Sequence, residues 1–360
     1  MVSVLFLVGS VSATSIPVEL AIVLARETDT DVTIVPFYDD EPPDGIPGLD
    51  AVNVAALGAD SRFDLGAFRA LWTQLREHRV DILHTHDNFL GSAGRVLGAL
   101  ARRRIVDTEH RAHDSMTTLQ NLANAPTLPL STVVVGNSQT TLDSFGLVER
   151  ALLSAAQTPT RVIHNGVDVK RVRAATPAEF GAGPTVVCAA RFVPVKNHQT
   201  LVRAFGRLLE DHPTARLVLA GDGPRRPAIE SLVADLRVED AVRFVGSVSR
   251  ERVYELYAGA DAFAIASRAE GFCVAAVEAL AAGLPVVASD IPVFHEVLGD
   301  AAAFADPDDP GAFGARLAEM LTASDRAAQL GNASVERAEQ FRIERTAREY
   351  AAVYNDVLSE

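Results

Sequence analysis

Short apolar runs alternate with helix-length amphipathic segments along the whole chain of 360 residues. Buried parallel strands have near-continuous apolar sequences, and helices that connect them are typical of stacked βα units. The alternation therefore predicts an α/β protein built on parallel sheets. The expected strands are Val2–Val8, Val32–Phe37, Asp81–Leu83, Ile105–Asp107, Thr132–Val135 and Arg161–Ile163 in the first half, and Thr185–Ala190, Arg216–Ala220, Val242–Val245, Ala262–Ala266 and Pro285–Ala288 in the second.

The chain length suggests two domains, each large enough to bury its own core. Between the halves, Asp168–Pro184 is polar, contains Pro and Gly and has no strong periodicity, so we interpret it as a linker. The last segment, Ile343–Leu358, has apolar residues at helical spacing. We expect a domain of residues 1–166, joined by this helix at 343–360, and a second domain of residues 167–342.

The unusual residues of the chain fall just after predicted strands. Ligands of open α/β sheets bind at the carboxyl ends of the strands, so two such sheets predict a site in a cleft between two doubly wound, Rossmann-like domains. The residues in these positions are Gly9, His84, His86, His110, Asn165, Arg191, Gly221, Gly246, Glu270 and Ser289.

Composition excludes several classes of protein. A net charge of −14 argues against a nucleic-acid partner, which requires clustered Lys and Arg. Only two cysteines are present, which favours a reducing compartment and therefore the cytoplasm. No apolar run is long enough to span a membrane. The apolar segment Val4–Val8 has no basic residue before it, so we interpret it as a buried strand and not as a signal peptide.

The stretch Ser267–Asp290 contains the most specific pattern. A strand ends at Ala266, a loop contains Glu270, and a helix is expected to begin near Phe272. Free amides at a helix start can bind a phosphate or a polarised sugar oxygen. Glu278 lies within the first two turns of that helix and could accept hydrogen bonds from two neighbouring hydroxyls.

A basic pair follows the strand that ends at Ala190. Arg191 and Lys196 are five residues apart, and Lys196 is one of only two lysines in the chain. A cation about 4 Å from a phosphate charge contributes roughly 4 kcal/mol at an effective dielectric constant of 20. Two such cations could therefore take the place of a metal ion beside a leaving diphosphate.

Taken together, Glu270-Gly-Phe, Glu278-Ala-Leu-Ala-x-Gly-x-Pro-Val-Val, the Arg191 and Lys196 pair and Asn165-Gly-Val-Asp resemble the retaining glycosyltransferases of family four, which have the two-domain GT-B fold. The resemblance covers nearly the whole chain, most strongly over residues 161–300. It implies a nucleotide diphosphate sugar as co-substrate, with no metal and no other cofactor. The donor-binding residues that it implies are Gly9, Arg191, Lys196, Gly246, Val248, Glu270, Gly271, Phe272, Cys273 and Glu278.

Individual roles follow from the same resemblance. Glu270 would contact the donor sugar, Glu278 the ribose hydroxyls, and Arg191 with Lys196 the diphosphate. Gly246 and Val248 would receive the nucleotide base. The loop after the first strand has a single glycine, Gly9, where the family often has two.

The amino-terminal half would provide the acceptor side. The resemblance implies that His86, His110 and Asn165 line it, with His110 also bonding the donor sugar near the reacting carbon. His84-Thr-His86-Asp87 also suggests a metal site, although no further His or Cys stands at ligand spacing. For His84 a core position is the alternative. Asp306-Pro-Asp308-Asp309 resembles a metal-binding motif, but its prolines favour a turn and helix cap.

The resemblance, together with these residues, implies a retaining, metal-independent glycosyltransferase with Arg191, Lys196, Glu270 and His110 as catalytic residues. The acceptor would be a glycan, a lipid-linked saccharide or a small metabolite. Two alternatives remain open, a hydrolysing nucleotide-sugar epimerase and a non-catalytic nucleotide-sugar binder. The run Arg102–Arg104 has two interpretations, cations at a helix end or a peripheral contact with anionic lipid at the inner face of the membrane.

Overall fold

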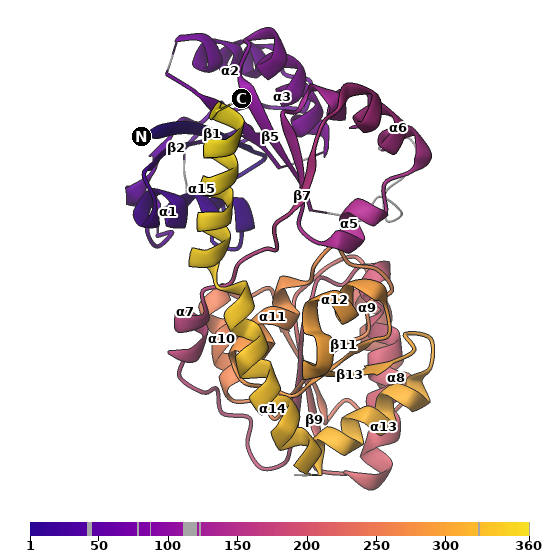
Figure 1. Ribbon diagram of the computed structural model, residues 1–360. Coiled ribbons are helices and arrows are strands. Elements are labelled where there is room, and N and C mark those ends of the chain that lie inside the picture. The colour runs from indigo at the N-terminus through magenta and orange to yellow at the C-terminus, as the bar shows by residue number, and fades with distance from the viewer. Residues whose placement is uncertain are drawn as a thin grey trace. The chain divides into compact units, whose positions relative to one another are not determined.

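The computed structural model describes residues 1–41, 45–77, 79–86, 88–110, 121, 124–322 and 325–359. It divides the chain into two compact units. Unit 1 comprises Met1–Gly166 and Ile343–Glu360, and unit 2 comprises Val167–Arg342. Figure 1 shows the elements of both units, coloured along the chain.

Unit 1 is built on a seven-stranded sheet whose order is β3-β2-β1-β4-β5-β6-β7. All neighbouring strands of this sheet are parallel. The strands are β1 Val2–Val8, β2 Thr30–Pro36, β3 Asn53–Val54, β4 Ile82–Thr85, β5 Arg104–Glu109, β6 Val133–Gly136 and β7 Thr160–Val162. The α-helices are α1 Ile16–Glu27, α2 Leu65–Glu77, α3 Asn88–Leu100, α5 Gln139–Asp143, α6 Leu147–Ala156 and α15 Ile343–Ser359, and the 3₁₀ helices include η1 Leu49–Ala51 and η3 Ala125–Leu130.

Strand β1 lies in the middle of this sheet. Val4 aligns with Val32 of β2 and with Ile82 of β4, and residues Val4–Val8 are all buried. A strand with neighbours on both sides and helices on both faces has no polar surface to present, which explains the apolar run. The segment that superficially resembles a signal peptide is therefore a buried strand, as expected.

The last helix, α15, belongs to unit 1 although the whole of unit 2 precedes it in the chain. It packs against α1, as Figure 1 shows. Its buried face includes Ala347, Tyr350 and Tyr354, which join the core formed by β1 and α1. The predicted amphipathic helix is confirmed, because its apolar positions form this face.

Unit 2 has a six-stranded parallel sheet of order β10-β9-β8-β11-β12-β13. Both sheets start near the middle and wind outward in both directions, which confirms the doubly wound architecture. The strands are β8 Thr185–Ala189, β9 Arg216–Ala220, β10 Val242–Gly246, β11 Ala262–Ile265, β12 Val286–Ser289 and β13 Ala302–Ala305. The helices are α7 Val169–Arg173, η4 Pro194–Lys196, α8 His198–Asp211, α9 Arg226–Asp235, α10 Arg250–Ala258, α11 Val274–Ala281, α12 Pro292–Leu298, η5 Gly299–Ala301, α13 Pro310–Leu321, α14 Asp325–Ala338 and η6 Glu339–Phe341.

Every expected strand is present to within two residues at either end, whereas strands β3 and β13 and helix α7 were not predicted. Strand β3 is only two residues long, and β13 consists mostly of alanine, which has a low strand propensity. The expected linker contains the short helix α7, which Asp168 caps by accepting the backbone N–H of Arg171 at 2.9 Å. These elements form because the neighbouring strands and the cap stabilise them.

Candidate active site

Lys196 and Glu270 meet at the carboxyl ends of β8 and β11. The Lys196 ammonium donates to Glu270 Oε1, and the Ser267 hydroxyl donates to the same oxygen at 2.7 Å. Both charged side chains are largely buried, with 19% and 10% of their surface exposed. Burial is the largest single effect and opposes the charge on Lys196, but the Glu270 carboxylate acts against it through both its charge and its hydrogen bond, and the pKa of Lys196 lies above its usual value. This end of unit 2 therefore holds a permanent cation.

Arg191 lies exposed in the loop that joins β8 to Lys196. The loop is anchored by the backbone, because Phe192 N–H donates to Asp222 O at 2.9 Å and Arg268 N–H donates to Val195 O at 2.8 Å. These two bonds tie the loop to the segments after β9 and β11. The two predicted phosphate cations thus stand on one anchored loop, with Lys196 held and Arg191 open to solvent.

Helix α11 begins directly after Gly271, Phe272 and Cys273. Cys273 has a φ of 71°, and the helical conformation starts at Val274. The Phe272 side chain is buried at 2% exposure and packs edge-to-face on Phe341, with ring centroids 5.5 Å apart. Phe272 can therefore serve a ligand only through its backbone, whereas its ring anchors the start of the helix.

Glu278 is buried on α11 and bound by two side chains of α10. Arg250 Nε donates to Glu278 Oε1 at 3.0 Å, and the Tyr254 hydroxyl donates to the same oxygen at 3.2 Å. Arg250 and Glu278 are 6% and 5% exposed as residues. Sequence reasoning missed both partners, since Arg250 opens a helix after a serine cap, where an arginine is ordinarily solvated. The ion pair keeps the buried Glu278 oriented.

Gly246 ends β10 at an irregularity of the sheet. Its φ is 72°, the strand register shifts between Phe244 and Gly246, and its carbonyl accepts Gly221 N–H at 2.8 Å. Val248 follows, half-buried, in the loop before α10. The structure thus brings the predicted base-binding residues to the same edge of unit 2 as Glu270, at the end of another strand.

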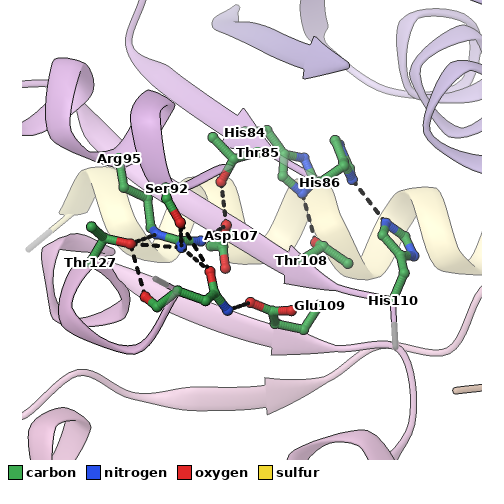
Figure 2. A network of polar contacts seen from close by, with 11 residues as sticks. His84, Thr85, His86, Ser92, Arg95, Asp107, Thr108, Glu109, His110 and Thr127 are labelled. Atoms are coloured by element: carbon green, nitrogen blue, oxygen red, sulfur yellow. Dashed lines mark hydrogen bonds and ion pairs between the residues drawn. The ribbon is translucent and has the colours of Figure 1, made fainter. Parts of the chain in front are cut away.

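Three histidines gather at the ends of β4 and β5 in unit 1, as Figure 2 shows. His84 is fully buried, with Nδ1 2.7 Å from the Tyr354 hydroxyl and Nε2 2.8 Å from the Thr108 hydroxyl. His84 is thus a core histidine. His86 is 7% exposed, and its Nδ1 lies 3.2 Å from Nε2 of the half-buried His110. The two predicted acceptor-side histidines contact each other directly.

Beside these histidines lies a buried ion pair, also drawn in Figure 2. Arg95 and Asp107 have 0% and 2% of their side chains exposed and approach to 2.5 Å. Arg95 also donates to Thr127, and Asn124 donates to Glu109 at 2.7 Å. This network joins β5 to α3 and η3, and it holds the end of β5 from which His110 emerges.

The remaining predicted positions lie in connecting segments of unit 1. The Gly9 carbonyl accepts Tyr38 N–H at 3.0 Å, and Val11 N–H donates to Asp39 at 2.7 Å. The single-glycine loop is thus held by the segment after β2. Asn165, 8% exposed, follows β7. Asp87, part of the metal hypothesis, lies outside the described residues.

The acidic run 306–309 and the arginine run 102–104 both have defined contacts in the structure. Asp309 caps α13 by accepting the N–H groups of Gly311 and Ala312, so the acidic run is the expected turn and cap. Arg103 does not stabilise the end of its own helix, because its Nε donates to Leu75 O in the last turn of α2 at 2.7 Å. Arg104 is the first residue of β5. Over the described residues, no helix is long and apolar enough to cross a membrane.

Two family models match the chain in succession. The model described as Glycosyltransferase Family 4 matches residues 18–171, and the model described as Glycosyl transferases group 1 matches residues 174–337. The D-inositol 3-phosphate glycosyltransferase of Mycolicibacterium smegmatis is 31% identical over 327 residues, which cover 83% of this chain and 72% of that protein. The N-acetyl-alpha-D-glucosaminyl L-malate synthase of Bacillus anthracis is 30% identical over 57% of this chain and 54% of its own.

Solved structures share the fold. The sucrose-phosphate synthase of Thermosynechococcus elongatus superposes with a TM-score of 0.80 and 20% identity, covering all of both chains. Anabaena HepE, solved in complex with UDP and glucose, superposes with a TM-score of 0.81 and 18% identity over 99% of this chain and 100% of its own. These matches confirm the expected GT-B fold. Together with the family models and the relatives, they show that the chain belongs to the group 1 glycosyl transferases of glycosyltransferase family 4.

Proposed function

We propose that the protein transfers a sugar from a nucleotide diphosphate sugar to a hydroxyl acceptor with retention of the anomeric configuration and without a metal ion. The observation that carries this proposal is the contact between Lys196 and Glu270, which lie 74 residues apart in the chain. It places a protonated amine and a carboxylate beside the start of α11. Such a pair can bind a nucleotide diphosphate sugar, because the amine attracts the anionic phosphates and the carboxylate accepts hydrogen bonds from the sugar hydroxyls.

Different residues bind the leaving diphosphate and the two sugar rings of the donor. Lys196 and Arg191 bind the diphosphate and offset the charge that grows as the bond from the anomeric carbon to the phosphate oxygen breaks. Glu278 accepts hydrogen bonds from the ribose hydroxyls, and Glu270 accepts hydrogen bonds from hydroxyls of the sugar, whereas backbone N–H groups at the start of α11 donate to oxygens of the sugar. His110 contacts the sugar near the reacting carbon.

The acceptor oxygen attacks the anomeric carbon from the face that the phosphate leaves. Its proton passes to the departing phosphate oxygen, so the products are the glycoside and the free nucleoside diphosphate. Because both bonds lie on the same face of the sugar, the configuration is retained. In this scheme the leaving phosphate is the base, and the protein stabilises its charge.

The acceptor side involves His86, His110 and Asn165 of unit 1. The acceptor belongs to one of three classes, a glycan, a lipid-linked saccharide or a small metabolite. A lipid-linked acceptor would give the exposed Arg102 a peripheral membrane contact. Cys188 and Cys273 are buried and free, which supports a reducing compartment, the cytoplasm.

Nucleotide release from UDP-, GDP- and ADP-sugars in excess chelator tests the proposal. UDP-glucose is the first donor to try, because the structural neighbour HepE was solved with it. We expect slow release from one donor, unaffected by chelator and lost in Glu270→Ala. Glu230→Ala is the matched control, since Glu230 is an exposed glutamate paired with Arg226.

Three results would contradict the proposal. Release that chelator abolishes would show a metal requirement, and full activity in Glu270→Ala would remove that residue from the site. Donor binding by calorimetry, without release for any acceptor offered, would favour a non-catalytic binder. With an acceptor found, the proton NMR coupling constant of the new anomeric centre, compared with that of the donor, tests retention.

A further inference from the structure

His86 and His110 form a stacked, hydrogen-bonded pair at the carboxyl ends of β4 and β5 (Figure 2). Their rings are 5.5 Å apart between centroids with an interplanar angle of 26°, and the Nδ1 to Nε2 distance is 3.2 Å. His110 is half-buried, whereas His86 is 7% exposed. His86, the less accessible ring, therefore holds the more accessible ring of His110 in place.

His86 is itself fixed by the core. Its ring stacks on Phe6 of β1 at 5.0 Å and lies 4.0 Å from the ring of His84, measured between centroids. His84 in turn is hydrogen-bonded through both nitrogens, to Tyr354 and to Thr108. Because these neighbours are buried, His86 cannot turn without repacking the centre of unit 1.

Burial, with His84 and His110 beside it, lowers the pKa of His86 well below its usual value. The ring is therefore neutral, with one donor nitrogen and one acceptor nitrogen. Among the described residues, its buried Nε2 has no hydrogen-bond partner. A buried N–H left without an acceptor is rare. The proton of His86 accordingly belongs on Nδ1, from which it is donated to His110 Nε2.

We propose that His86 is a positioning residue that fixes the ring and the tautomer of His110. In this arrangement His110 Nε2 is an acceptor toward His86, so the proton of the His110 ring lies on Nδ1. The inference rests on the proposed function, in which His110 contacts the donor sugar. According to this inference, His86 does not line the acceptor side itself but acts through His110.

Three substitutions at His86 separate positioning from packing. In His86→Asn the amide can reach the place of Nδ1, whereas in His86→Gln it reaches the place of Nε2. His86→Phe keeps the stacked ring and has no nitrogen. We expect Gln and Phe to lower kcat roughly ten- to hundredfold, since small misplacements cost that much. Asn should stay within about threefold of wild type, and KM for the donor should change little in all three.

Nitrogen NMR of protein labelled at its histidines gives a readout independent of activity. The signals of His110 are assigned from their loss in His110→Phe. We expect wild type and His86→Asn to show His110 with a protonated Nδ1 and a bare Nε2. In His86→Phe these shifts should move toward the averaged values of a ring that exchanges between tautomers. Unchanged His110 shifts in His86→Phe would overturn the proposal.

The activity results distinguish this proposal from the proposed function. If His110→Phe keeps wild-type release, the role of His110 in the proposed function fails. If His110→Phe loses activity while His86→Gln and His86→Phe keep it, the positioning role fails alone. Equal losses in Asn, Gln and Phe that follow their melting temperatures would show that His86 acts only through packing, which also overturns the inference.

Discussion

Replacing Arg250 with methionine removes the cation that pairs with Glu278 and keeps most of the side-chain length. Arg250 Nε is 3.0 Å from Glu278 Oε1, and both side chains are 7% exposed. At this distance two unit charges attract by about 5.5 kcal/mol at an effective dielectric constant of 20. Removing one partner of a buried pair costs about 3–5 kcal/mol, because the other charge is left buried.

We therefore expect Arg250→Met to lower the free energy of unfolding of unit 2 by about 3–5 kcal/mol. Glu278→Gln in the same chain removes the stranded carboxylate, and the Tyr254 hydroxyl can still donate to the amide oxygen. The double variant should thus lose less stability than the sum of the two single variants. A coupling of at least about 1 kcal/mol is expected for groups in direct contact.

Urea unfolding followed by two signals measures this effect. The single tryptophan, Trp72, lies on α2 in unit 1, so its fluorescence reports that unit, whereas far-ultraviolet circular dichroism reports both. We expect Arg250→Met to lower the dichroism midpoint and to leave the fluorescence midpoint unchanged. Arg252→Met, a half-exposed neighbour paired with Glu255, is the matched control.

The reasoning is refuted if Arg250→Met unfolds within about 0.5 kcal/mol of wild type, the range of ordinary surface substitutions. Strict additivity in the double variant would also refute it, since it would mean that the two charges do not interact. The double-mutant cycle of Arg250 and Glu278 measures stability alone. Nucleotide binding to Glu278→Gln separately tests whether Glu278 binds the ribose hydroxyls.

Three further outcomes are expected. Lys196→Ala should lower kcat for nucleotide release roughly 10²- to 10³-fold, and near wild-type turnover would show that Lys196 does not stabilise the leaving diphosphate. Burial raises the pKa of Asp107 to about 6 in the folded state, so folding takes up a proton between the unfolded value of about 3.9 and 6. The stability contribution of Asp107 is complete below that range and is lost as the pH rises through it, so the free energy of unfolding of Asp107→Asn should rise relative to that of wild type between pH 4 and 7.5; a constant difference in melting temperature would contradict this. Tyr354→Phe removes a hydrogen bond at 2.7 Å from the buried His84 and should cost about 1–3 kcal/mol, seen as faster amide exchange in α15, whereas wild-type protection would contradict it.

The sequence predicted the elements whose hydrophobic pattern is strong. Strands β1 and β9 begin and end at the predicted residues, because uninterrupted apolar runs have no other stable place than a sheet covered on both faces. Strand β13, with three alanines in four residues, exists only because it pairs with β12. Its register is a tertiary property that no local pattern contains.

In the candidate site, too, local motifs were predictable from the sequence, whereas contacts that depend on tertiary packing were not. Glu278 stood out through its motif, but its partner Arg250 did not, because a helix start is usually exposed and the pairing depends on how α10 packs on α11. Phe272 was expected at the donor, and its ring proves to be part of the core. Motifs thus indicated which residues matter, whereas their contacts came from packing across elements far apart in the chain.

The membership of α15 in unit 1 has a consequence for protein synthesis. The ribosome makes residues 343–359 only after the whole of unit 2, so unit 2 can complete its core while unit 1 still lacks its last helix. Until then α1 lacks the helix that packs against it, and the apolar core that it shares with Tyr350 and Tyr354 of α15 stays uncovered. A nascent chain halted before Ile343 would therefore expose this surface to chaperones and proteases, although its amino-terminal residues were made first.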